Sequence, residues 1–159
     1  MSTEQNKALV RQMVEEVFNR GNTGHADLFL APNFVEHEEL PPGLPSDREG
    51  AKQLFAMLRG AFPDFKATLE DMVAEGDKVV MRMTWSGTHK GEFMGIPPTG
   101  RYMSIGVIDI IRFAEGKAVE HWGQTDTMGL MQQLGAVPAR VGAEARHWAE
   151  VATKAPRML

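Results

Sequence analysis

Chemically useful side chains gather in the segment EHWGQTD, residues 120–126. If this segment is an extended strand, alternation places Glu120, Trp122, Gln124 and Asp126 on one face. An aromatic ring, an amide and a carboxylate on one face suit the binding of an enolisable carbonyl compound and the transfer of its proton. The segment is therefore the first candidate for an active site.

Asp126 has two competing interpretations. Aspartate is a preferred N-cap residue, and a helix is expected directly after it. The alternative is a catalytic acid/base. A carboxylate with an ordinary pKa of about 4 is a weak base. An apolar pocket disfavours the charged form, which raises the pKa and makes the carboxylate a stronger base. The catalytic interpretation therefore predicts that Asp126 lies inside an apolar cavity.

Two other titratable side chains could take part. His37 ends a short expected strand before a proline-rich loop, where it could donate a hydrogen bond or shuttle a proton. Asp109 shares its strand face with apolar residues only. A lone carboxylate there must be paired, with Arg82 or Arg112, or must lie in a functional cavity.

The sequence also offers material for an apolar pocket. It contains 11 Met, 8 Phe and 3 Trp, which either fill an ordinary core or line an adaptable cavity. His89 shares an expected strand face with Met83 and Trp85 and could lie at the rim of such a pocket. His121 is expected to point away from Trp122, which favours a structural or interface role.

Composition excludes several classes of function. The 159 residues make one domain, with 43% hydrophobic and 24% charged residues. The net charge of −4 and the absence of a Lys/Arg cluster argue against nucleic acid and membranes as partners. The chain has no cysteine, so disulfides and Cys-based zinc sites are excluded. No metal-ligand spacing, phosphate loop or nucleophile elbow is present, and the polar N-terminus favours a cytoplasmic protein.

Hydrophobic periodicity predicts helices followed by a meander of strands. Ser2 with Gln5, and Ser46 with Glu49, have the spacing of capping boxes. The expected helices are 2–20, 24–30, 46–60, 128–134 and 143–152, and the expected strands are 33–37, 66–75, 78–90, 103–113 and 117–125.

This order predicts an α+β fold. Helices that precede a run of strands suggest an antiparallel sheet with one face covered by the N-terminal helices. A strongly bent sheet closed by helices forms a cone, and an apolar cone is a natural site for a small molecule.

The motifs also resemble a known family. The segment GTHKGEFMGIPPTGR (87–101), the pair EHWGQTD and QQLG, and the segment FVEHEELPPGLPSDREGAKQ are similar to those of the SnoaL-like polyketide cyclases of the NTF2-like superfamily. The resemblance covers roughly residues 9–135. It implies a conical α+β domain over 1–135 and a part-helical C-terminal extension over 136–159.

The resemblance implies a reaction as well. Characterised cyclases of this family close a ring of a polyketide ester by intramolecular aldol condensation, with an aspartate as acid/base and without cofactor or metal. That aspartate corresponds to Asp126, and the histidine of VEH corresponds to His37. The side chains expected to bind substrate are Trp122, Gln124, Asp109, His89, Trp85 and Met83.

Other functions stay open at this point. Relatives in the superfamily include an isomerase and an epoxide hydrolase; Asp109, Asp126 and an arginine could imitate the site of the latter. The same cone could also bind an apolar ligand without catalysis. A homodimer is expected through the uncovered sheet face, which would carry Val119 and His121.

Overall fold

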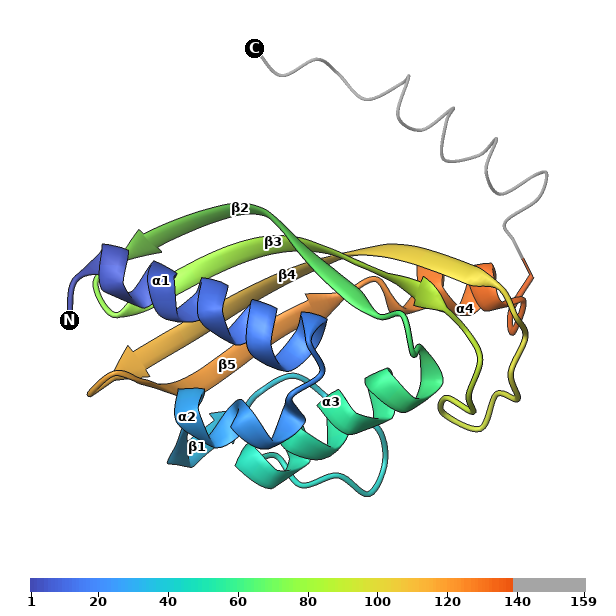
Figure 1. Cartoon of the computed structure of the whole chain (residues 1–159), viewed down its shortest axis with the longest axis horizontal. Coiled ribbons are helices and arrows are strands. Elements are labelled where there is room, and N and C mark those ends of the chain that lie inside the picture. Colours follow the sequence, from blue (N-terminus) through green and yellow to red (C-terminus); the bar gives the residue numbers. More distant parts are fainter. Residues whose placement is uncertain (139–159) are drawn as a thin grey trace, which may run out of the picture.

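The computed structural model describes residues 1–138 of the chain (Figure 1). Its elements, in chain order, are helix α1 Thr3–Met13, a π-helical segment Val14–Asn19, a 3₁₀ turn Thr23–His25, helix α2 Ala26–Phe29, strand β1 Leu30–Glu36, helix α3 Arg48–Ala61, strands β2 Lys66–Glu75, β3 Lys78–Thr88, β4 Tyr102–Ala114 and β5 Lys117–Thr125, and helix α4 Thr127–Leu134. The predicted order of helices and strands is confirmed.

The five strands form one curved sheet in the order β1-β5-β4-β3-β2. The pairs among β2, β3, β4 and β5 are antiparallel, as expected. Strand β1 joins the edge parallel to β5, which the expectation of a wholly antiparallel sheet did not include. Helices α1 and α3 lie on one side of the sheet and cover its concave face (Figure 1). The result is the expected α+β cone.

The helix starts follow from local chemistry. Ser2 and Gln5 form the predicted capping box of α1, and the buried residues Val10 and Met13 face the core. The cap of α3 is Asp47 rather than Ser46, because the Asp47 carboxylate accepts hydrogen bonds from the backbone N–H groups of Glu49 and Gly50.

Strand β4 shows which sheet face is interior. Met103, Ile105, Val107 and Ile111 are buried, while the residues between them are more exposed. Asp109 falls on this buried face. The odd-numbered residues of β4 therefore point into the cone, as the sequence predicted.

No helix within residues 1–138 is both long and apolar enough to cross a bilayer. The helix predicted over 143–152 lies outside the described residues, as does most of the predicted extension 136–159.

Candidate active site

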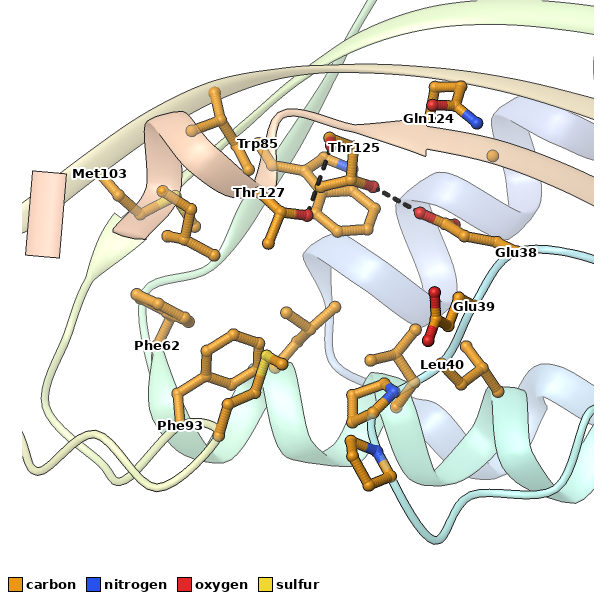
Figure 2. A pocket seen from close by; sticks show the side chains of 18 of the residues that line it. Glu38, Glu39, Leu40, Phe62, Trp85, Phe93, Met103, Gln124, Thr125 and Thr127 are labelled. Atoms are coloured by element: carbon orange, nitrogen blue, oxygen red, sulfur yellow. Dashed lines mark hydrogen bonds between the residues drawn. The ribbon is translucent and has the colours of Figure 1, made fainter. Parts of the chain in front are cut away.

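An open cavity of about 470 Å³ lies between the loop that follows β1, helix α3, the concave sheet face and the start of α4. Figure 2 shows Glu38, Glu39 and Leu40 reaching into it from the loop, with Phe62, Phe93 and Met103 on the opposite wall. The lining is mostly apolar: Leu40, Pro41, Pro42, Leu54, Leu58, Phe62, Trp85, Phe93, Met94, Met103, Ile105 and Leu130. A hydrophobic small molecule is the ligand that such a lining suits.

The side chains of β5 that point into the cone alternate with those that the sequence predicted. A tight turn pairs Ala114 with Lys117 and Phe113 with Ala118, but the next pair is Arg112 with Glu120. The extra residue is Val119, a β-bulge that shifts the register by one. A one-residue shift moves every following side chain to the other face.

The shifted register places Gly123 opposite the inward-facing Asp109. Because paired residues share a face, His121, Gly123 and Thr125 belong to the interior face. Without the bulge, the ladder that begins at the turn would have placed Trp122 opposite Asp109. The predicted face of Glu120, Trp122 and Gln124 is therefore the outer one.

His121 lies between two carboxylates. Its Nδ1 atom is 2.7 Å from Oε1 of Glu36, and its Nε2 atom is 3.3 Å from Oδ1 of Asp109. The second contact is an ion pair rather than a well-aligned hydrogen bond, because that Asp109 oxygen has no hydrogen-bond donor. Burial alone would lower the pKa of His121, but the two carboxylates outweigh it and raise the pKa to about 10. His121 is therefore an imidazolium at neutral pH.

Glu38 connects this buried group to the cavity. Its backbone N–H donates to Oε1 of Glu36 (2.9 Å), and its Oε1 atom accepts from the Thr125 hydroxyl (2.9 Å). Burial raises the pKa of Glu38, and the charges of Asp109 and Glu36 act in the same direction, whereas Thr125 and His121 partly oppose them. A raised pKa makes this carboxylate a better base than an exposed one. Among these acidic residues, Glu38 alone belongs to the lining of the 470 Å³ cavity.

Glu36, Glu38 and His121 could also be considered as metal ligands, since one donor atom from each lies within 4.8 Å of the others. The proton on His121 argues against this set. An imidazolium has no free lone pair, and a group with a pKa of about 10 gives up its proton reluctantly at neutral pH. The three groups could therefore bind an ion together only after His121 loses its proton.

The location predicted for Asp126 is wrong. Asp126 is exposed, is not among the residues that line the cavity, and accepts a hydrogen bond from the Gly129 N–H (2.9 Å) as the N-cap of α4. Strand β5 ends at Thr125, and the Asp126 backbone (φ −71°, ψ 69°) turns the chain away from strand geometry. Strand parity therefore does not extend to residue 126.

The other residues predicted on that face lie outside or at the rim. Trp122 is only partly buried and stacks on the His37 ring, with centroids 4.7 Å apart. His37 Nε2 lies 3.2 Å from Oε1 of Glu120, which also pairs with Arg112. His37 and Gln124 are among the residues that line the cavity, whereas Trp122 is not.

The remaining predicted residues are buried. Trp85 lines the cavity, and Met83 and Asp109 lie behind it around a void of about 40 Å³. His89 is fully buried, with Nδ1 3.0 Å from the Thr99 hydroxyl, and it lines neither space.

The pairing predicted for Asp109 is also wrong. The residue that pairs with Asp109 is His121, and Arg112 instead pairs with Asp77 and Glu120 on the outer side. The hydrolase arrangement of Asp109, Asp126 and an arginine around one water does not form, since Asp126 lies outside the cavity.

Sequence reasoning missed Glu36, Glu38 and the inward position of His121. Glu36 and Glu38 are two residues apart, so an extended chain places them on one face. That face lies beside β5 through the parallel β1–β5 pairing, in which Glu36 is the partner of His121. The spacing was visible in VEHEE, but the parallel pairing was not.

Comparison with known proteins agrees with this architecture. The family profile of the SnoaL-like polyketide cyclases matches residues 8–134. The chain is 30% identical over 120 residues to nogalonic acid methyl ester cyclase of Streptomyces nogalater, which covers 74% of this chain and 89% of the relative. It is 32% identical over 134 residues to an aklanonic acid methyl ester cyclase of Streptomyces galilaeus. That match covers 80% of this chain and 89% of the relative.

Solved structures give the same result. TsrD of Streptomyces laurentii superposes with a TM-score of 0.78 at 34% identity, covering 86% of this chain and 99% of TsrD. AclR, a candidate hydroxylase of Streptomyces galilaeus, superposes with a TM-score of 0.79 at 30% identity. The match covers 96% of this chain and 94% of AclR. Sequence match and shared fold together show that the chain belongs to the SnoaL-like polyketide cyclase family.

Proposed function

We propose that this protein closes a ring in a hydrophobic polyketide ester by intramolecular aldol chemistry, without a cofactor. The observation that carries the proposal is the meeting of a largely apolar cavity with the cluster of Glu36, Glu38, Asp109 and His121. The names of the relatives, which are cyclases of aklanonic and nogalonic acid methyl esters, support the substrate class.

The cluster suits the chemistry of an enolisable carbonyl compound. Removal of a proton alpha to a carbonyl is aided by a base with a raised pKa, and partial burial raises the pKa of Glu38. The apolar walls hold a flat hydrophobic substrate and exclude water, which strengthens electrostatic interactions with the developing enolate.

The test is a direct assay. The purified protein is incubated with aklanonic acid methyl ester or nogalonic acid methyl ester, without added metal or nucleotide, and the products are followed by liquid chromatography and mass spectrometry. We expect an isomer of unchanged mass and new retention time. If neither these esters nor other polyketide esters are consumed, the proposal is overturned.

The same assay separates the alternatives. AclR is described as a hydroxylase, which gives a specific reason to consider oxidation. In that case the product would gain one oxygen atom, and the reaction would require added dioxygen and a reductant. A binding protein without catalysis would retain the ester unchanged in native mass spectrometry. An isomerase or lyase would give products that nuclear magnetic resonance distinguishes from the ring-closed ester.

We also propose that the protein is a cytoplasmic homodimer that pairs through the outer sheet face. His121 cannot contribute as expected, because it points into the cone, and Val119 is buried. The exposed apolar side chains there are Val73 on β2, and Tyr102 and Ile108 on β4. Light scattering after size exclusion tests the dimer, and Ile108→Lys should shift it to monomer.

A further inference from the structure

We propose that Glu38 is the catalytic base, and that the loop after β1 delivers it into a space that Gly123 leaves empty on strand β5. This assignment rests on the proposed function, because it names the group that performs the proton transfer. It makes Gly123 a positioning residue for the reaction.

The space beside Gly123 is occupied by the Glu38 carboxylate. A Cβ atom added to Gly123 would lie 2.2 Å from Oε2 of Glu38 and 2.9 Å from Oδ1 of Asp109. Distances under 3.0 Å are contacts that a real Cβ does not make. The Glu38 carboxylate therefore fills the place where a side chain of residue 123 would begin.

Gly123 has no conformational reason to be glycine, since it is not among the glycines with positive φ. It lies in the middle of β5, where glycine weakens a strand and often marks a close approach of another group. Here that group is the Glu38 side chain, which explains the glycine without any turn or bulge at this position.

Several contacts fix the delivered carboxylate. Glu36 accepts hydrogen bonds from both the Glu38 backbone N–H and His121, so it ties the loop to the partly buried imidazolium. The Thr125 hydroxyl holds Oε1 of Glu38. These hydrogen bonds hold both the backbone and the carboxylate of Glu38, which lines the cavity.

The reaction balances with this single base. The Glu38 carboxylate takes a proton from the carbon alpha to a substrate carbonyl, and the electron pair forms the enolate. The enolate carbon then bonds to a second carbonyl carbon of the same molecule, whose oxygen becomes an alkoxide. Protonated Glu38 returns the proton to that alkoxide, so the product is an isomer of the substrate.

The geometry predicts that the carboxylate can be moved from the loop to the strand. An aspartate at position 123 would place its carboxylate beside Asp109, where that of Glu38 now lies. The activity test compares wild type, Glu38→Ala, and Glu38→Ala combined with Gly123→Asp. We expect Glu38→Ala to lower kcat by about 100-fold or more, the usual contribution of a general base, with a smaller change in KM. The double variant with Gly123→Asp should have a kcat about 10-fold or more above that of Glu38→Ala alone.

A matched control places the same new carboxylate elsewhere. Gly106 lies on β4, and an added Cβ there would meet nothing within 4 Å. Glu38→Ala combined with Gly106→Asp should therefore stay inactive. If Glu38→Ala keeps wild-type kcat, or if Gly106→Asp rescues as well as Gly123→Asp, the base assignment is overturned while the proposed function stands.

A second readout does not depend on activity. Gly123→Ala should lower Tm in the wild-type background, because the new methyl group meets the Glu38 carboxylate, and should lower it much less in the Glu38→Ala background. Equal effects in both backgrounds would overturn the steric claim. An inactive wild type would overturn the proposed function and the base assignment together, and this thermal comparison would still decide whether Gly123 makes room for Glu38.

Discussion

At the scale of single residues, neighbouring acidic groups have different roles because their surroundings differ. Glu38 is half buried between carboxylates, whereas Asp126 is exposed and caps α4 through the Gly129 N–H. We expect Asp126→Ala to lower the free energy of unfolding by about 0.5–2 kcal/mol, the usual value of an N-cap, and to leave turnover unchanged. Denaturant unfolding and the ester assay measure the two effects.

The control for this prediction is Asp126→Ser, since serine is also a preferred N-cap residue. It should recover most of the lost stability. A large fall in kcat for Asp126→Ala, at a temperature where the variant is folded, would show that Asp126 takes part in the reaction after all.

At the scale of elements, the bulge at Val119 decides which side chains of β5 point into the cone. It turns His121 inward between Glu36 and Asp109 and leaves Glu120 outside, in contact with Arg112 and His37. We expect His121→Gln to cost roughly 3–5 kcal/mol of folding stability, because it leaves buried carboxylates without their cation. Glu120→Gln should cost much less, since Glu120 and Arg112 are both partly exposed to solvent and such ion pairs are weak.

Thermal unfolding of the two variants, made side by side, checks this contrast between adjacent residues. A loss for Glu120→Gln that equals the loss for His121→Gln would mean that the register of β5 differs from the one described. The glutamine keeps a donor at residue 121, so the experiment tests the charge more than the volume.

At the scale of the whole molecule, stability should depend on pH through His121. Its pKa is about 10 in the folded state and about 6.5 in the unfolded chain. A raised folded pKa adds stability that is complete below the unfolded pKa and is lost as pH rises through the folded pKa. Between pH 7 and 10 the free energy of unfolding should therefore fall, by up to about 1.4 kcal/mol per pH unit.

Denaturant unfolding at several pH values across that window measures the slope, and wild type is compared with His121→Gln. The variant lacks the titrating group and should show a much flatter profile. An equally steep profile in the variant would assign the pH dependence to other groups.

The sequence by itself determined the elements and much of their placement. Alternation along β4 correctly placed Asp109 among the buried apolar residues, and the two tight turns at Gly76 and Gly116 fixed the hairpins. These features depend on residues close together in the chain, whose backbone preferences and burial patterns are local. The family motifs added the fold, and their resemblance suggested the class of reaction that we propose.

Tertiary structure alone decided which residues form the site. The register of β5 depends on one extra residue, Val119, and the meeting of Glu36 with His121 depends on the parallel pairing of β1 with β5. The bulge lies within the hairpin of β4 and β5, where no local signal marks the extra residue. The contact of Glu36 with His121 joins residues 85 apart in sequence. Alternation has a period of two. In β4 the apolar residues mark the inner face, but in β5 the bulge exchanges the two faces, and only the packed sheet shows which of them is inside.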